Sequence, residues 1–291
     1  MFKKTMRTYL ECIPCFMKQA IEMARLVTGN EIVHKKIVDE VAKMIPEFSL
    51  GASPPAMARR IHQVMEKHIG RIDFYKDIKR KSNERALELY PRLKDKVDRS
   101  VNRLLTAVEI AIAGNVIDYA VKNTLNIEHE IDKIFREDFS EIGKTAFAFE
   151  AFQEDWGRAE TVLYLADNAG EVVFDRVLIE ECPPDKKVFY AVRGKAVIND
   201  ALVEDAEFCG IGDRAQIITS GVDAPGTILK YCAREFVDLF NRADLVISKG
   251  QGNYEALSDI TRKVYFLFRA KCPVIAAHAN VPLGDVVLLK G

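Results

Sequence analysis

The chain has 291 residues, of which 48% are hydrophobic and 29% are charged, and its formal net charge is −1. This length predicts one large or two modest domains with a sizeable apolar core. The balanced charge gives no indication of a nucleic-acid partner or a membrane surface, and no apolar run approaches the roughly 18 residues that span a bilayer. No apolar segment follows the basic N-terminus, so we expect no signal peptide and a cytoplasmic protein. Nothing in the sequence indicates its oligomeric state.

The first half of the sequence, residues 1–155, predicts only helices. Apolar residues recur at helical spacing in most of its segments, and Ser53 followed by two prolines is a typical helix start. The predicted helices are residues 15–27, 31–44, 53–69, 73–89, 97–122 and 128–135. We expect these helices to form a domain of their own, residues 1–155.

The second half, residues 156–291, predicts an α/β domain. Short β-rich runs occur at residues 161–166, 187–192, 215–219, 244–248, 264–268 and 285–290. Helical segments are expected between the first four runs, at residues 171–181, 201–209 and 227–241. Strands that alternate with helices in this way form a parallel sheet through right-handed crossovers, so we expect a doubly wound fold.

Each of the first four predicted strands ends in a polar loop that contains glycine. These loops carry oxygen ligands, two cations and several glycines: Asp167, Asn168 and Asp200, with Asp205 and Asp223 as further candidates, then Arg193 and Lys249, then Gly170, Gly194, Gly221, Gly250 and Gly252. In a parallel sheet all four loops lie at the same edge. Carboxylate and amide oxygens suit Mg²⁺ or Mn²⁺, and cations with glycine-exposed backbone N–H groups suit phosphate. The pattern predicts a metal-assisted phosphate site.

Each of these residues also has a simpler interpretation. Asp167 and Asn168 are favoured helix N-caps, and Asp200 could cap the helix that follows it. A single Arg193 or Lys249 after a strand is commonly a solvated side chain. The metal–phosphate interpretation therefore depends on the convergence of four consecutive strand ends.

Predicted helix 97–122 carries two polar residues within an apolar sequence. Asn115 and Asp118 are three residues apart and share one face of that helix. Because buried polar groups need partners, we assign Asn115 to a wall of the site, where it would contact the substrate. An interdomain hydrogen bond, or an Asp118 that faces water, is the alternative.

Cys12 and Cys15 form a C-x-x-C pair at the start of the first helix. No second cysteine pair or nearby histidine completes a local zinc site. The βαβ context of a redox pair is absent as well. Two packed thiols are the default interpretation, with a redox pair as the alternative.

Six motifs in this order resemble a known family. They are C-I-P-C, G-N-V-I-D-Y, L-A-D-N-A-G-E, R-G-K-A-V-I-N-D-A, G-x-D-A-P-G-T and S-K-G-Q-G-N-Y-E. The chain resembles the damage-control phosphatases, a former domain-of-unknown-function family, and within it the prokaryotic subfamily with a CxxC motif. The resemblance covers nearly the whole chain.

The resemblance implies a helical domain, a Rossmann-like α/β domain and a metal-dependent phosphatase activity. The metal ligands that it implies are Asp167, Asn168 and Asp200, with Mn²⁺ or Mg²⁺ as cofactor and Ni²⁺ or Co²⁺ as alternatives. The implied substrates are small phosphorylated metabolites that are damaged or in surplus, such as sugar phosphates or cofactor-related phosphates.

Our mechanistic hypothesis is hydrolysis of a phosphomonoester with help from the bound ion. Asp167, Asn168, Asp200 and Lys249 are the predicted catalytic residues. Arg193 and Lys249 would neutralise the phosphate oxygens. The remaining predicted substrate contacts are Gly250, Gly252, Asn253, Asn115 and Glu171.

Three alternatives remain open at this point. Asp167 could be a phosphorylated nucleophile, although Ala169 stands where that chemistry usually places a second aspartate. An S-adenosylmethionine-dependent carboxyl methyltransferase is a second alternative. Such an enzyme is expected to have a glycine-rich loop after the first strand and an acidic residue at the end of the second strand. In this chain the first loop contains only Gly170, and the second strand ends in Arg193. A non-catalytic metal- or nucleotide-binding module is the third.

Overall fold

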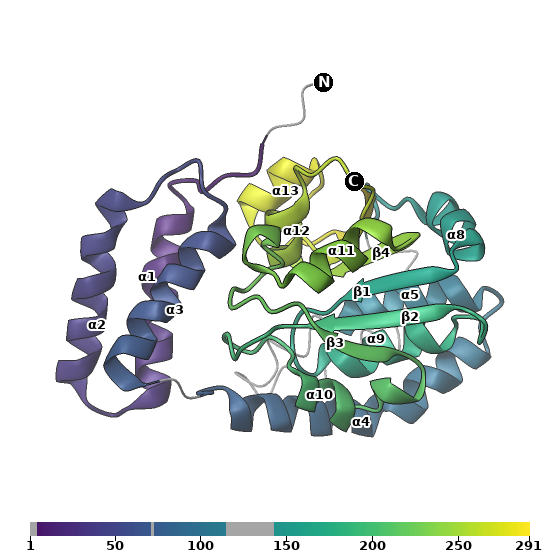
Figure 1. The fold of residues 1–291 in the computed structure, drawn as a ribbon, viewed down its shortest axis with the longest axis horizontal. Coiled ribbons are helices and arrows are strands. Elements are labelled where there is room, and N and C mark those ends of the chain that lie inside the picture. Colours follow the sequence, from purple (N-terminus) through teal and green to yellow (C-terminus); the bar gives the residue numbers. More distant parts are fainter. Residues whose placement is uncertain (1–4, 71–72, 115–142) are drawn as a thin grey trace.

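The computed structural model of the chain describes residues 5–70, 73–114 and 143–291 (Figure 1). Asn115, Asp118, the end of predicted helix 97–122 and the whole of predicted helix 128–135 lie outside the described residues. The predicted contact between Asn115 and the substrate therefore stays a prediction.

The first three helices form a unit of their own, which stands to the left of the sheet in Figure 1. They are α1 (Cys12–Val27), α2 (Glu31–Met44) and α3 (Pro54–Ile69), with a short 3₁₀ turn at Ile45–Glu47. Their apolar faces bury residues such as Phe16, Ile37 and Ile61 against one another. Helical periodicity at 15–27, 31–44 and 53–69 thus predicted these helices correctly.

A six-stranded sheet forms the centre of the rest of the molecule. Its strands are β1 (Thr161–Leu165), β2 (Lys187–Val192), β3 (Gln216–Thr219), β4 (Leu245–Lys249), β5 (Tyr265–Arg269) and β6 (Val286–Lys290). The strand order is β3-β2-β1-β4-β5-β6. The first five strands pair in parallel, and β6 pairs antiparallel to β5. This confirms the α/β, Rossmann-like class, whereas the antiparallel direction of the edge strand β6 was not predicted.

Helices cover both faces of this sheet. One face carries α4 (Lys76–Asp98), α5 (Arg103–Ala113), α8 (Phe149–Arg158), α9 (Glu171–Glu180) and α10 (Val203–Phe208), and the other carries α11 (Arg234–Arg242), α12 (Gln251–Leu257) and α13 (Pro273–Ala279) (Figure 1). Successive strand residues alternate between the two apolar cores: Val162 and Tyr164 lie in one, Leu163 and Leu165 in the other. Because both faces are covered, the strands read as continuous apolar runs.

Two predicted helices are shorter or divided in the structure. The predicted helix at 97–122 is interrupted, because its first two residues are the end of α4 and a new helix, α5, begins at Arg103. The Asn102 side chain caps α5 by accepting a hydrogen bond from the backbone N–H of Leu105. The predicted helix at 227–241 is replaced by a 3₁₀ turn, Leu229–Tyr231, followed by the short helix α11.

The helices of the first half do not all belong to one body. The apolar core on one face of the sheet includes Leu93 of α4, Ile110 of α5 and Trp156 of α8. These three helices therefore pack as part of the α/β layer structure, whereas α1–α3 have cores of their own. The domain limit at 155/156 stays a prediction. The apolar clusters of the described residues group α4, α5 and α8 with the sheet.

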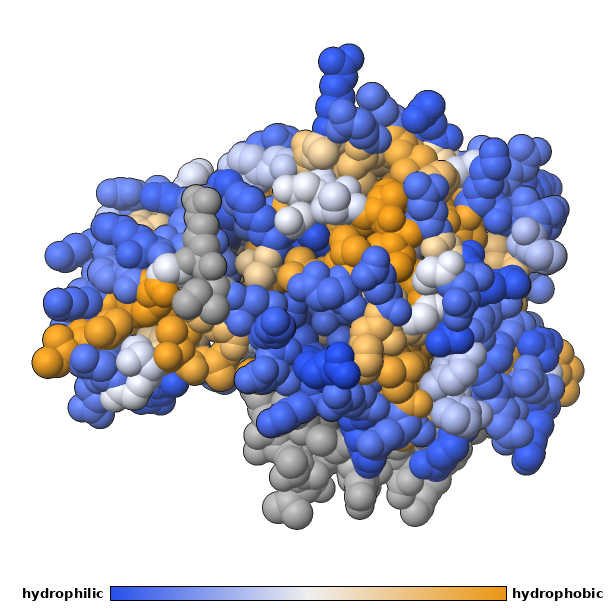
Figure 2. Space-filling view, turned by 60° about the horizontal axis from the view of Figure 1, so that its bottom comes forward, coloured by the Kyte–Doolittle hydropathy of each residue, from blue (hydrophilic) through white to orange (hydrophobic). Residues whose placement is uncertain are grey.

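The surface is mostly hydrophilic, with separate apolar areas. Figure 2 shows one of these areas at the left end of the molecule, over the α1–α3 unit. Leu26 of α1 and Ile32 of α2 are exposed apolar residues of this unit. Among the described residues, none of the helices combines the length and the apolar character that crossing a bilayer requires.

Candidate functional site

The site lies where the strand order reverses. From β1 the chain passes to β2 and β3 on one side, and β4 then returns to pair with β1 on the other side. Ligands of doubly wound sheets bind outside the carboxyl ends of the strands at such a switch point. Asp167 and Asn168 follow β1, and Gly250 follows β4. The loop after β2 brings Arg193 and Asp200 to the same edge.

Backbone hydrogen bonds join the loop after β1 to the loop after β2. The N–H of Ala169 donates to Asn199 O over 2.9 Å, and the N–H of Ala201 donates to Asp167 O over 2.8 Å. Asn168 and Asp200 thereby form an isolated antiparallel bridge. The loop also contains Ile198, a β-branched residue at φ 47°, a strained conformation of the kind that clusters at functional sites.

Asp167, Asn168 and Asp200 do not cap the helices that follow them. Helix α9 has Gly170 at its N-cap without a side-chain hydrogen bond, and α10 begins only after Leu202. The N-cap interpretation of Asp167, Asn168 and Asp200 is therefore wrong. These side chains contact other groups of the site instead.

Arg193 bridges the two aspartates. Its Nε donates to Asp200, its Nη1 donates to Thr227 Oγ1 over 3.0 Å, and its Nη2 lies 3.8 Å from Asp167 Oδ1. All three charged side chains are buried, and Arg193 Nη2 has no hydrogen-bond partner among the described residues. Burial raises the pKa of Asp200, against the opposing effect of the Arg193 charge. The Arg193 Nη2 group is thus a buried donor that could bind one further oxygen atom.

Asn168 is held by carboxylates on its nitrogen side. Its Nδ2 donates to Asp167 Oδ2 over 3.0 Å and to Glu171 Oε1 over 2.9 Å. The amide oxygen, the atom that would bind a cation, therefore lies on the other side of the group.

Lys249 is enclosed beneath these residues. Its ammonium lies 3.2 Å from Glu171 Oε2 and 2.5 Å from Asp175 Oδ1, and its exposed fraction is 0%. Burial alone would lower the pKa of Lys249, but Asp175 and Glu171 outweigh this effect and raise it, so the side chain stays charged. A phosphate contact through Lys249 stays a prediction. In this structure the ammonium faces two carboxylates.

Asp175 forms the floor of the site and was absent from the sequence prediction. It accepts hydrogen bonds from the Tyr164 and Tyr190 hydroxyls, each over 2.8 Å, besides its contact with Lys249. Burial raises the pKa of Asp175, although Lys249 acts against this. Asp175 lies four residues after Glu171 and so on the same face of α9. That spacing was the signal available in the sequence.

The Asn253 side chain ties loops together. Its Nδ2 donates to Ala166 O and Lys249 O, and its Oδ1 accepts from the N–H and the hydroxyl of Thr227. These bonds occupy both groups of the amide, and a contact of Asn253 with the substrate stays a prediction.

Two predicted glycines are needed for close packing. At Gly250, φ is +79° and a Cβ would lie 1.9 Å from Asp167 Oδ2. At Gly252 a Cβ would lie 2.3 Å from Pro225 O. A side chain at either position would displace a neighbouring loop.

The remaining acidic candidates connect the helical part to the site. Asp205 accepts from Lys79 and Asn83 of α4, and Asn83 in turn accepts from the N–H of Gly170 over 2.6 Å. Asp223 pairs with Arg59 of α3 through two hydrogen bonds. These bonds use both oxygens of Asp205 and of Asp223, so these two carboxylates suit a metal ion less well than Asp200 does.

The charges of the site suit a divalent cation. Asp167, Glu171, Asp175 and Asp200 are four buried carboxylates, and Arg193 and Lys249 are the two buried cations beside them. With all four carboxylates ionised, two negative charges are in excess, which is costly in a buried environment. Within the described ranges no three His, Cys, Asp or Glu side chains gather around one point. An ion here would therefore have two carboxylates and the Asn168 amide as protein ligands, with water completing its shell, as Mg²⁺ and Mn²⁺ accept.

Cys12 and Cys15 lie at the start of α1, where Cys12 is half-buried and Cys15 is exposed. Both are free thiols, and burial raises the pKa of Cys12 above its ordinary value. A raised pKa disfavours the thiolate, which is the reactive form, and this favours the packed-thiol interpretation for Cys12.

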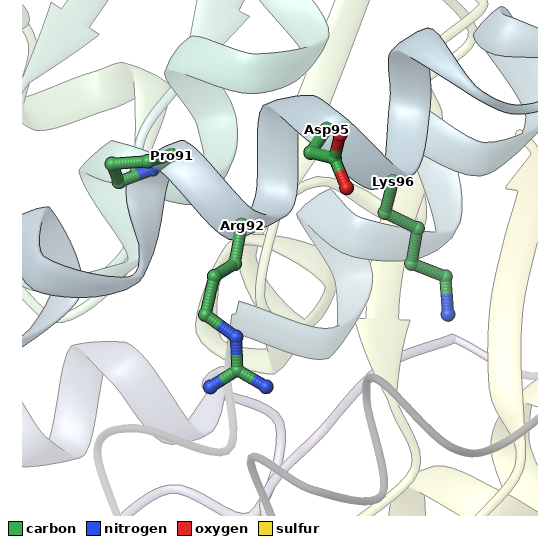
Figure 3. Close-up of a pocket in the computed structure, with 4 residues that line it drawn as sticks. All are labelled: Pro91, Arg92, Asp95 and Lys96. Atoms are coloured by element: carbon green, nitrogen blue, oxygen red, sulfur yellow. The ribbon is translucent and has the colours of Figure 1, made fainter.

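A surface pocket elsewhere is unrelated to these residues. It is lined by Pro91, Arg92, Asp95 and Lys96 of α4, and Arg92 and Lys96 extend from the same side of the helix (Figure 3). None of the strand-end residues contributes to it.

Comparisons with known proteins agree with the motifs. A family model described as the damage-control phosphatase ARMT1-like domain matches residues 8–287. Damage-control phosphatases of Pyrococcus horikoshii and Archaeoglobus fulgidus are each 33% identical, over 98% of both chains for the first and over 95% of this chain and 96% of the relative for the second. An uncharacterised protein of Methanocaldococcus jannaschii is 35% identical over 96% of this chain and 94% of its own length.

A comparison of structures also finds a Pyrococcus horikoshii protein. The crystal structure of a DUF89 family protein from Pyrococcus horikoshii matches with a TM-score of 0.84 and 32% identity, over 98% of this chain and 99% of that one. The chain therefore belongs to the damage-control phosphatase ARMT1-like domain family, as its motifs predict.

Proposed function

We propose that this protein is a metal-dependent phosphatase that hydrolyses phosphomonoesters of small, damaged or surplus metabolites. The names of its relatives support a phosphatase role in metabolite damage control. The observation that carries the proposal is the contact of Asp167 and Asp200 with one buried guanidinium, whose Nη2 has no hydrogen-bond partner within the described chain. Excess carboxylate charge beside a spare cationic donor suits both a cation and a phosphate.

Asp167, Asn168 and Asp200 would hold the ion, which we propose to be Mn²⁺ or Mg²⁺, with Ni²⁺ or Co²⁺ as alternatives. When bound, such an ion polarises a phosphoryl oxygen and helps to activate water. The excess of two buried negative charges supports this ligand set, because a divalent cation would balance it.

Arg193 would bind the phosphate group. Its Nη2 would donate to a phosphoryl oxygen and balance the charge that moves in the transition state. Asp200 and Thr227 hold the other nitrogens of the guanidinium, so its orientation is fixed before the substrate arrives. Pre-organisation of this kind costs no rearrangement during the reaction.

The proposal is tested by phosphate release from protein that has been treated with a chelator. Sugar phosphates and a chromogenic phosphomonoester are supplied with Mn²⁺, Mg²⁺, Ni²⁺ or Co²⁺ in turn. We expect no release without metal and recovery when one of these ions is returned. Release that chelation does not affect would contradict the metal requirement. Methyl transfer from S-adenosylmethionine, or ligand binding without turnover, would favour the methyltransferase or the binding-module alternative.

Gly250→Ala should reduce hydrolysis by about 10²-fold, the effect of moving a reacting group by roughly 1 Å. The new Cβ would lie 1.9 Å from Asp167 Oδ2, so that carboxylate must move. The positive φ adds a backbone cost of about 1–3 kcal/mol to folding. Steady-state kinetics and urea unfolding would measure the two effects.

The matched control for this prediction is Gly284→Ala. Gly284 has φ +95°, but a Cβ there meets nothing within 4 Å. This variant should lose comparable stability and keep the wild-type rate of hydrolysis. Equal rates in both variants would contradict the role given to Asp167.

A further inference from the structure

The orientation of the Asn168 amide matters for any cation at this site. An asparagine binds a cation through Oδ1 only, because Nδ2 carries two hydrogens and donates. Rotating the amide by half a turn would present those hydrogens to the ion. Asn168 therefore needs a neighbour that distinguishes its two ends.

Glu171 is such a neighbour. An ionised carboxylate only accepts hydrogen bonds, and its Oε1 lies 2.9 Å from Asn168 Nδ2. Asp167 Oδ2 accepts from the same nitrogen over 3.0 Å. Two acceptors on one side fix the nitrogen there and turn the oxygen away from them.

Glu171 is itself held from below. Its second oxygen accepts from the Lys249 ammonium over 3.2 Å, and the side chain is fully buried. Lys249 also contacts Asp175, which the Tyr164 and Tyr190 hydroxyls fix in place. A continuous series of contacts thus runs from the sheet through Lys249 and Glu171 to Asn168.

We propose that Glu171 is a positioning residue: it orients the Asn168 amide so that its oxygen faces the cation, and Lys249 with Asp175 holds Glu171 for this task. This inference rests on the proposed metal-dependent function, and it gives Glu171 and Lys249 a different role from the predicted substrate contact. Partners of this kind beyond the ligands typically change metal affinity by 10- to 100-fold.

Glu171→Gln tests the proposal with almost no change in shape. Lys249 would attract the oxygen of the introduced glutamine, whose NH₂ group would then face Asn168. The Asn168 amide would rotate to accept from it, and its oxygen would be lost to the cation. We expect Mn²⁺ to bind about 10- to 100-fold more weakly, measured by electron paramagnetic resonance of free Mn²⁺ in titrations of chelator-treated protein.

Glu180→Gln is the matched control, because Glu180 is the last residue of the same helix and is likewise ion-paired, with Lys94 and Arg176. Its Mn²⁺ affinity should equal that of the wild type. Circular dichroism and thermal unfolding would show whether either variant remains folded.

A second substitution separates orientation from a merely structural role. In Asn168→Asp the two ends of the side chain are alike, so no orientation is needed, but a third carboxylate now adjoins Asp167 and Glu171. Combined with Glu171→Gln, the introduced glutamine donates to the introduced aspartate. We expect the double variant to bind Mn²⁺ more tightly than either single variant, which loss of packing would not produce.

The outcomes distinguish this inference from the proposed function. If the wild type binds Mn²⁺, Asp167→Ala does not, and Glu171→Gln binds as the wild type does, the positioning role is overturned while the metal site stands. If Glu171→Gln weakens binding but the double variant is no tighter than the single variants, the orienting role is overturned as well. If the wild type binds none of Mn²⁺, Mg²⁺, Ni²⁺ or Co²⁺, the proposed function fails and the inference with it.

Discussion

Asp167→Asn should lower metal-dependent phosphomonoester hydrolysis by at least about 10²–10³-fold, the loss typical of removing one pre-organised electrostatic group. The substitution removes one of the two carboxylates that would hold the cation and leaves the shape of the side chain unchanged. Because Asp167 is buried beside Arg193, the neutral amide also leaves the guanidinium with a single close carboxylate, Asp200. Steady-state phosphate release at saturating Mn²⁺ would measure the effect.

Asp244→Asn is the control for this prediction. Asp244 lies just before β4, and its Oδ2 accepts from the backbone N–H groups of Glu160 and Thr161. It therefore stands at the opposite edge of the sheet, where an asparagine oxygen can replace the accepting atom. Hydrolysis should be unchanged in this variant. Full activity of Asp167→Asn would refute the assignment of the site.

Lys249→Met should destabilise the folded protein by about 3–5 kcal/mol, the cost of leaving buried charge without its partner. Glu171 and Asp175 are both fully buried and would lose their common cation. Urea unfolding near pH 7.5, compared with the wild type, would give the difference. The same variant should bind Mn²⁺ more weakly, because Glu171 would no longer be held.

The destabilisation by Lys249→Met should depend on pH. Burial raises the pKa of Asp175, and without Lys249 this effect is unopposed by that charge. A carboxyl whose pKa is raised in the folded state contributes most to stability at low pH, where it is protonated in both states. That contribution is lost as the pH rises through the folded-state pKa. The deficit of the variant should therefore shrink as the pH falls from 7.5 towards 5.

Lys290→Met serves as the control for the lysine substitution. Lys290 pairs with Asp155 at 2.8 Å, and both side chains are 29% exposed. Removal of an ion pair that water reaches should cost no more than about 1 kcal/mol. A comparable loss in the two variants would show that enclosure of Lys249 is not what matters.

The sequence predicted the sheet well because strand formation depends on local pattern. All six predicted strands occur, within about one residue of their expected ends. Their apolar runs are continuous because helices cover both faces. The alternation of these runs with helical segments also predicted the crossovers between the strands. The antiparallel edge strand β6 was not distinguished from its neighbours, because strand direction depends on how the chain returns to the sheet.

The sequence also identified which edge of the sheet carries the polar residues. Asp167, Asn168 and Arg193 lie within three residues of a strand end, and parallel topology alone brings such positions together. Helix ends were less predictable. The break between α4 and α5 depends on a single cap at Asn102, which periodicity does not reveal.

Tertiary structure alone decided what each polar side chain contacts. Lys249 is 78 residues from Glu171 in sequence, and its enclosure by two carboxylates follows only once β4 pairs with β1. Asn253 appeared to be a ligand candidate, but its amide is used by backbone groups and by Thr227.

What the sequence by itself determined is the family, the layered α/β fold and the sheet edge that carries the charged loops, since each of these is encoded in motifs, apolar periodicity and strand order. The partners within that edge were decided by the fold. Short-range pattern fixes local conformation, whereas the balance of buried charge around Asp167, Asn168 and Asp200 depends on loops that meet only after the sheet has formed.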